Sequence, residues 1–99
     1  MISSEREEAA SLGQRVVELD RAGKGEASVS LCDEIVARFS ARDTDARIRY
    51  EVARALRNKA VGLSQLGRHH DAIETCDELA RTFAEDDDAD IREAAAMGA

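Results

Sequence analysis

The sequence predicts an all-α protein of about five helices, and three observations support this prediction. None of its 99 residues is proline, only six are glycine, and alanine, arginine, glutamate and leucine, which favour helices, are abundant. Apolar residues recur every three or four positions, and no stretch alternates with the period of two that a half-buried strand requires. The octapeptides CDEIVARF and CDELARTF lie 44 positions apart, which indicates an internal repeat.

The repeat extends well beyond these octapeptides. Residues 10–41 align with the segment 44 positions further on, and DARIR (Asp45–Arg49) returns as DADIR (Asp88–Arg92) once one residue is dropped. Repeats of this length usually correspond to one supersecondary unit each, stacked on its neighbours. We therefore expect a single domain at 1–99, with units at about 4–41 and 45–84 and a partial third unit or capping helix at 88–99.

The first unit contains two segments in which apolar residues have helical spacing. In the first, at about 4–22, the apolar stripe consists of Leu12, Val16, Leu19 and Ala22. RAGKGE follows, where a glycine after an apolar helix end is suited to a left-handed C-cap. In the second, at about 26–40, the stripe consists of Val29, Cys32, Ile35, Val36 and Phe39. The first unit is therefore expected to form a pair of amphipathic helices.

The second unit repeats this pattern, and a shorter segment follows it. SARDTDA supplies aspartate and threonine for an N-cap, and the next helix, at about 45–66, has a stripe of Ile48, Val52, Leu56, Ala60, Leu63 and Leu66. After QLGRHHD, which has its own C-cap glycine, a helix at about 70–84 has an apolar face of Ala72, Ile73, Cys76, Leu79 and Phe83. The acidic AEDDDAD then precedes a last helix at about 89–97.

At this point the chain resembles a known family. ALRNKAVGLSQLGRHHDAIETCDELARTF (Ala55–Phe83) is similar to a tetratricopeptide repeat (TPR), and the long spacing between units resembles the extended bacterial variety with repeats of about 44 residues. The resemblance depends on Leu56, Ala60, Leu63, Gly67, Ala72, Ile73 and Leu79. It implies antiparallel helical hairpins stacked as a short right-handed solenoid.

Charge and hydropathy exclude some classes of partner. Asp and Glu total 21 against 14 Lys and Arg, and the resulting net charge of -7 disfavours nucleic acid and anionic lipid. The N-terminus lacks the apolar core of a secretory signal, and no run approaches the ~18 apolar residues of a membrane span. We expect a cytoplasmic protein with neither a nucleic-acid nor a membrane partner.

Two groups of residues are of types that can bind metals or take part in redox chemistry. Cys32 and Cys76 could be redox thiols or, with His69 and His70, metal ligands; alternatively, the cysteines pack as small apolar residues on the apolar stripes. Adjacent histidines on a helix point about 100° apart, which is unsuited to joint ligation. EDDDAD (Glu85–Asp90) lacks the central glycine and final glutamate of a calcium loop. With no catalytic or phosphate-binding motif either, we expect no catalytic residue, cofactor or metal, and a protein that is not an enzyme.

What the resemblance does imply is a binding surface. In TPR proteins the first helix of each unit lines a concave groove that holds an extended peptide or a partner's helix. The corresponding residues here are Gln14, Val17 and Arg21, then Arg47, Arg54, Arg57, Asn58, Val61 and Gln65. Arginine binds carboxylates through two parallel hydrogen bonds, so the partner would be an acidic or C-terminal peptide. The alternative is an ordinary solvated face, or one that a second copy covers.

The predicted function is therefore a noncatalytic protein–protein interaction module, an adaptor or scaffold with a concave, partly basic groove. Stacked repeats generally need about three units and polar caps. IREAAAMGA (Ile91–Ala99) is short and alanine-rich and has no charged cap. The alternatives are consequently a homodimeric structural or regulatory protein whose groove or flank is covered by its own second copy, or a fragment of a longer array.

Overall fold

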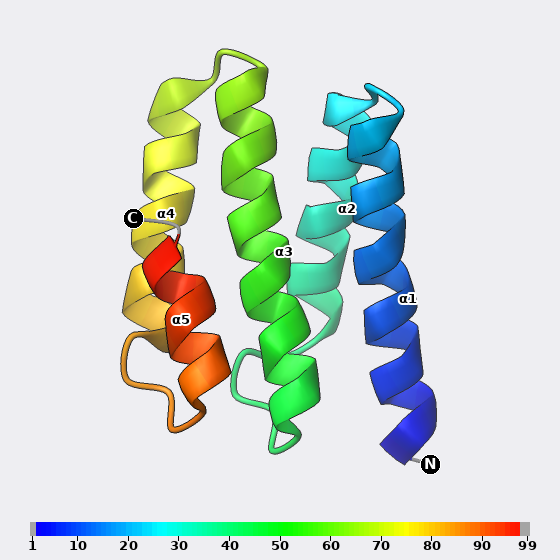
Figure 1. Cartoon of the computed structure of the whole chain (residues 1–99), viewed down its shortest axis with the longest axis vertical. Helices are drawn as coiled ribbons and strands as arrows, with labels where there is room; N and C mark the ends of the chain where they lie inside the picture. Colours follow the sequence, from blue (N-terminus) through cyan, green and yellow to red (C-terminus); the bar gives the residue numbers. More distant parts are fainter. Residues whose placement is uncertain (1, 98–99) are drawn as a thin grey trace.

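The computed structural model describes residues 2–97, which form five α-helices and no strand (Figure 1). The helices are α1 (Ile2–Arg21), α2 (Gly25–Arg38), α3 (Ala46–Gln65), α4 (His69–Phe83) and α5 (Ala89–Met97). Every helix begins and ends within two residues of its predicted bounds. The all-α prediction is therefore confirmed. Among the described residues no helix has both the length and the apolar character needed to cross a membrane.

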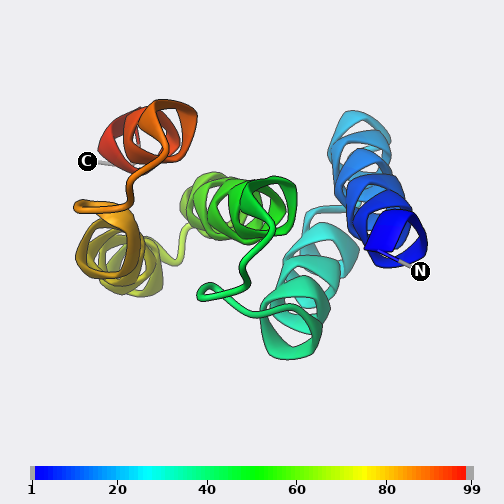
Figure 2. The ribbon, with the colours of Figure 1, turned by 90° about the horizontal axis from the view of Figure 1, so that it is seen from below.

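The helices alternate between two layers. Viewed from below, α1, α3 and α5 lie in one layer, and α2 and α4 lie in the other (Figure 2). Each helix packs against the next one in the chain, and α1 and α5 also pack on α3 within their layer. Helix α3 consequently contacts all four other helices and forms the centre of the molecule.

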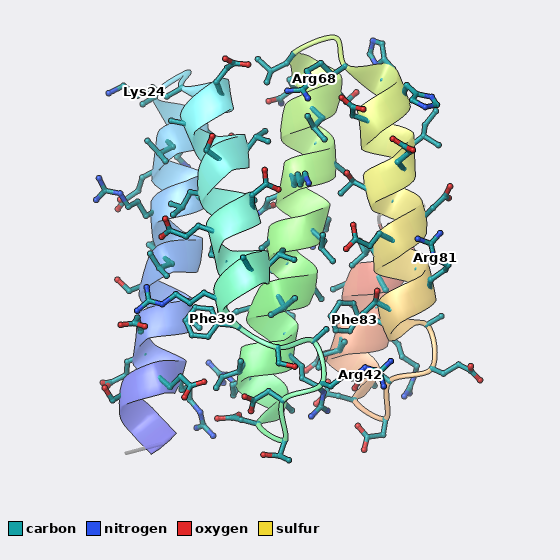
Figure 3. The ribbon with its side chains drawn as sticks, turned by 180° about the vertical axis from the view of Figure 1, so that it is seen from behind. Lys24, Phe39, Arg42, Arg68, Arg81 and Phe83 are labelled. Atoms are coloured by element: carbon teal, nitrogen blue, oxygen red, sulfur yellow. The ribbon has the colours of Figure 1, made fainter. Side chains whose placement is uncertain are left out.

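Two clusters of buried side chains hold the layers together. The larger one includes residues of all five helices, and the rings of Phe39 and Phe83 lie at corresponding ends of α2 and α4 within it (Figure 3). The smaller one joins α2, α3 and α4 through Val29, Leu63 and Ala72. A core of this kind, with only two phenylalanine rings, depends on the close approach of helices that have small apolar side chains.

The two tight turns are made by glycine, as the sequence predicts. Gly23 and Gly67 have φ angles of 75° and 80°, in the left-handed region that L side chains rarely adopt. The amide of Lys24 donates to the carbonyl of Leu19 at 2.9 Å, and the amide of Arg68 donates to that of Leu63 at 2.8 Å. These are the hydrogen bonds of a Schellman C-cap, which satisfies carbonyls that a helix end leaves without a partner.

The two longer loops also share one design, in which aspartates cap the following helix. Asp45 Oδ1 accepts from the Arg47 amide at 2.9 Å, and Asp88 Oδ1 accepts from the Asp90 amide at 2.9 Å. The predicted aspartate N-caps are therefore present in both loops.

The side chain of Arg49 joins these two loops through hydrogen bonds to both of them. Its guanidinium donates to both carboxylate oxygens of Asp86, at 3.0 and 3.1 Å, and to the Asp43 carbonyl at 2.9 Å. Burial is the largest single effect on the pKa of Asp86 and would raise it. The hydrogen bonds and charge of Arg49, together with hydrogen bonds from Asp88 and Asp87, outweigh burial and hold the pKa below its ordinary value. This bidentate ion pair links the connection between the units to the connection before α5.

Candidate protein-binding groove

The nine residues of the predicted binding surface do not lie together. Arg57, Val61 and Gln65 line one groove with residues of α4, whereas Arg47 lines a small separate cleft beside the start of α5. Arg54 points towards α1, where its Nη1 would lie 3.6 Å from a Cβ atom on Gly13, and it also lies 3.6 Å from the carboxylate of Glu51. The remaining four are exposed or half-buried, on α1 and α3: Gln14, Val17, Arg21 and Asn58.

The groove lies between the upper parts of α3 and α4 and has a volume of about 730 Å³. We call it the α3–α4 groove; its lining comprises Arg57, Ala60, Val61, Ser64, Gln65, His69, Ala72, Ile73, Cys76 and Asp77. Helix α5 packs on the lower parts of the same two helices (Figure 1). It buries Ile91, Ala94 and Ala95 there. The α3–α4 groove therefore continues the surface on which α5 is seated.

Large apolar side chains are exposed in this groove. Val61 is 47% exposed and Ile73 is 61% exposed, and the only other large apolar side chain so exposed among the described residues is Leu66, at the end of α3. The sequence places Ile73 on a buried stripe, and this expectation is wrong. The face of α4 is buried only where neighbouring helices cover it, and no residue in the described part of the chain covers Ile73 above α5.

The charge around the groove is mixed rather than basic. Arg57 is the only arginine in its lining, and His69 and Asp77 are the other ionisable side chains apart from Cys76. The floor consists of small apolar residues, Ala60 and Ala72, which are buried. An apolar floor with a polar rim is the usual composition of a protein-binding surface.

A second cleft, of about 560 Å³, lies on the opposite face, between α2 and α4 (Figure 3). Acidic side chains outnumber basic ones in its lining, which comprises Glu26, Val29, Ser30, Asp33, Lys59, Leu63, Arg68, Asp71, Glu74, Thr75 and Glu78. Both cations are paired within it, Lys59 with Asp33 at 2.7 Å and Arg68 with Asp71 at 3.0 Å. The first pair links α3 to α2, and the second joins the residue before α4 to the first turn of that helix.

The cysteines differ in their surroundings. Cys32 is fully buried, and burial, assisted by Asp20 and Asp33 and opposed by Lys59, raises its pKa to about 12. Its thiol is therefore protonated at neutral pH. Cys76 is half-buried in the α3–α4 groove. Within residues 2–97 no group of three His, Cys, Asp or Glu side chains is placed to hold a metal ion.

One buried ionisable residue, Glu51, is not among the residues that the sequence singles out. Glu51 on α3 is 8% exposed and faces Gly13 of α1. Burial raises the pKa of its carboxyl, and the guanidinium groups of Arg54 and Arg47 oppose the shift only partly. Its Oε1 accepts no hydrogen bond from the described part of the chain. Glu51 therefore makes the α1–α3 contact less stable than an apolar residue of similar shape would.

Comparison with known proteins assigns no family to the chain. No protein-family model, curated protein or solved structure matches it. The function is therefore inferred from the geometry of the α3–α4 groove and from the residues that line it.

Proposed function

We propose that the protein is a noncatalytic protein–protein interaction module, a TPR-like adaptor that binds a helix or peptide of a partner protein in the α3–α4 groove. The observation that supports this most directly is the exposure of Val61 and Ile73, 47% and 61%, on the two walls of one groove. Exposed apolar side chains that cluster in a groove with a polar rim are typical of a binding site.

The shape of the groove favours a helix as the bound element. Its walls are two neighbouring helices, and α5 already occupies the lower part of the same surface as a helix. An amphipathic helix that lies in a groove buries apolar residues at steps of three and four.

The order of the helices supports the TPR-like part of the proposal. Helices α1, α3 and α5 alternate with α2 and α4 between two layers (Figure 2), and both units end their first helix at a left-handed glycine. Stacked helical hairpins of a right-handed solenoid would have this order of layers. The resemblance of Ala55–Phe83 to a repeat of that family is consistent with it.

A catalytic role for the groove has no support in its geometry. His69 and Cys76 are the residues of its lining best suited to form a base and a nucleophile, but they are seven residues apart on α4. That spacing separates them by about 10 Å along the helix axis, beyond hydrogen-bond reach. The proposed role is therefore binding alone.

The experiment is affinity capture followed by titration. Immobilised protein would be incubated with an extract of the source organism, and each captured protein would be purified and titrated against wild type and the Ile73→Asp variant. We expect at least tenfold weaker binding by the variant, since a charge in the groove must be desolvated on binding. Ala37→Asp, at an exposed position of α2, is the matched control and should bind as wild type does.

Two outcomes would contradict the proposal. Equal affinity of Ile73→Asp and wild type for every captured protein would place binding elsewhere. Light scattering could instead show that the wild type is a dimer at all concentrations and that Ile73→Asp is a monomer. In that case a second copy of this chain occupies the groove, as in the homodimer alternative.

A further inference from the structure

Helix α1 packs on the rest of the fold through a narrow apolar stripe. It spans 20 residues, but among those whose burial the structure describes only Ala9, Gly13 and Val16 are buried. Gly13 has no side chain, and alanine and valine are small. Leu12 packs on the core and is only half-buried. Because apolar burial is the main source of the energy that docks a helix, α1 is held weakly for its length.

Each of the other helices buries at least one larger apolar side chain. Ile35 of α2, Phe83 of α4 and Ile91 of α5 are all 0% exposed, and Leu63 of α3 is 2% exposed. Even α5, with 9 residues, contributes an isoleucine to the core. The largest fully buried side chain in the described part of α1 is Val16.

The contact between α1 and α3 also encloses a carboxyl group. Glu51 is 8% exposed, and its Oε1 lies where a Cβ atom on Gly13 would be 2.5 Å away. This oxygen accepts no hydrogen bond from the described residues. Arg54 lies 3.6 Å from it but belongs to α3, so its attraction persists when α1 is absent. Docked α1 therefore keeps water from a carboxylate without giving it a partner, which costs free energy.

Polar contacts add little to the docking of α1. Arg6 pairs with Asp45 at 2.9 Å, and Glu8 pairs with Arg38 of α2. The side chains of Arg6, Glu8 and Arg38 are about half exposed, and exposed ion pairs are weak because water screens them. Near the other end of α1, Asp20 has a buried carboxylate oxygen for which the described residues provide no hydrogen bond.

The contacts among the other four helices do not involve α1. Helix α1 packs on α2 and α3, whereas α3 also packs on α4 and α5, and α4 packs on α5. The smaller core cluster, formed by Val29, Leu63 and Ala72, has no member on α1. Proteins open locally in units of this kind at a lower free energy than that of global unfolding.

We infer that α1 is a releasable helix, which undocks from α2 and α3 while the other four helices stay folded, and that ionisation of the Glu51 carboxyl makes this release easier. The carboxyl is enclosed when α1 is docked and reaches water when α1 is released. Burial raises its pKa above the ordinary 4.5. Docking is therefore strongest below that value and weakens as the pH rises through the raised pKa.

Neighbouring charges do not account for this pH dependence. Within the described residues, the charged groups that act on Glu51 are Arg54 and Arg47, both on α3, and both lower its pKa; α1, α2, α4 and α5 place none there. Arginines stay protonated in proteins. Arg6 lowers the pKa of Asp45 from 3.8, so the ion pair between them weakens as the pH falls, which is the opposite direction.

The test is hydrogen exchange of the full chain, followed by NMR at about pH 4.5 and about pH 7, which gives an opening constant for each amide. We expect amides at Gly13 and Val16 to have opening constants about tenfold or more above those at Leu56 and Leu79. At pH 7 the α1 constants should be about threefold or more above those at pH 4.5.

Two variants separate the charge of Glu51 from its shape. Glu51→Gln keeps the shape without the charge and should abolish the increase with pH. Glu34→Gln makes the same change at an exposed position of α2 and should behave as wild type does. Glu51→Leu, apolar and of similar size, should lower the opening constants of α1 at pH 7 about tenfold.

Three results would overturn the inference. Equal opening constants in α1, α3 and α4 would show that α1 does not leave separately. An increase with pH that persists in Glu51→Gln would assign the pH dependence to another group. Opening constants of α1 that rise in Glu51→Leu would show that the carboxyl stabilises the docked helix.

Discussion

Gly13 and Glu51 provide a test of how closely α1 and α3 pack. Gly13 is buried in the interior of α1, and a Cβ atom at this position would lie 2.5 Å from Oε1 of Glu51. Real Cβ atoms essentially never make so short a contact. The carboxylate therefore occupies the space that a side chain at position 13 would need.

Gly13→Ala combines two opposing effects on the free energy of unfolding. Alanine is better than glycine inside a helix by about 1 kcal/mol. Overpacking against Glu51 costs about 1–3 kcal/mol, because the carboxylate is 9% exposed and Arg54 lies beside it. We expect a net loss of about 1 kcal/mol in the wild-type background. In the Glu51→Ala background the obstacle is absent, so the same substitution should stabilise by about 1 kcal/mol.

The assay is urea denaturation of the wild type, the two single variants and the double variant, followed by far-ultraviolet circular dichroism. The expected coupling between the two positions is about 2 kcal/mol, of the size found for residues in contact. If Gly13→Ala stabilises both backgrounds equally, the carboxylate does not occupy the space beside Gly13 and the packing described between α1 and α3 is incorrect.

Three further predictions concern the ion pair, the core and the thiols. Arg49→Gln should lower the free energy of unfolding by about 2 kcal/mol at pH 7 in urea denaturation, because Asp86 loses a charged partner. Since the pKa of Asp86 is lowered from 3.8 in the fold, the contribution of the ion pair is complete above this value and is lost as the pH falls through the lowered pKa. Only the hydrogen bonds of Arg49 to backbone carbonyls then remain, so a difference that is undiminished in strong acid would contradict the assignment. Leu63→Ala should cost about 2–4 kcal/mol by the cavity it leaves, and a loss below about 1 kcal/mol would mean that this side chain is not enclosed. In the native chain iodoacetamide should modify Cys76 and spare Cys32, as peptide mass analysis would show; modification of both at similar rates would contradict the burial of Cys32.

Much of the fold could be predicted because its signals are local. The bounds of the helices follow from the spacing of apolar residues and from caps that act within a few residues, such as Gly23, Gly67 and Asp45. These signals depend on the chain's own backbone geometry. They therefore do not require knowledge of what lies on either side of a helix.

The site depends on neighbours, and there the sequence is less informative. Arg54 and Arg57 differ by three positions, about 60° around a helix, and this is enough to direct Arg54 towards α1 and Arg57 towards α4 and α5. Periodicity shows that Ile73 belongs to an apolar face, but not whether a neighbour is long enough to cover it.

The most direct test of whether the α3–α4 groove holds a partner's helix is site-specific photocrosslinking in cells of the source organism. A photoreactive amino acid would replace Ile73 in one strain and Ala37, on the exposed face of α2, in another. We expect an adduct with one partner protein at position 73, attached within a short amphipathic helix of that partner, and no such adduct at position 37. An adduct only with a second copy of this chain, or none at position 73, would contradict the proposal that the α3–α4 groove holds a partner's helix.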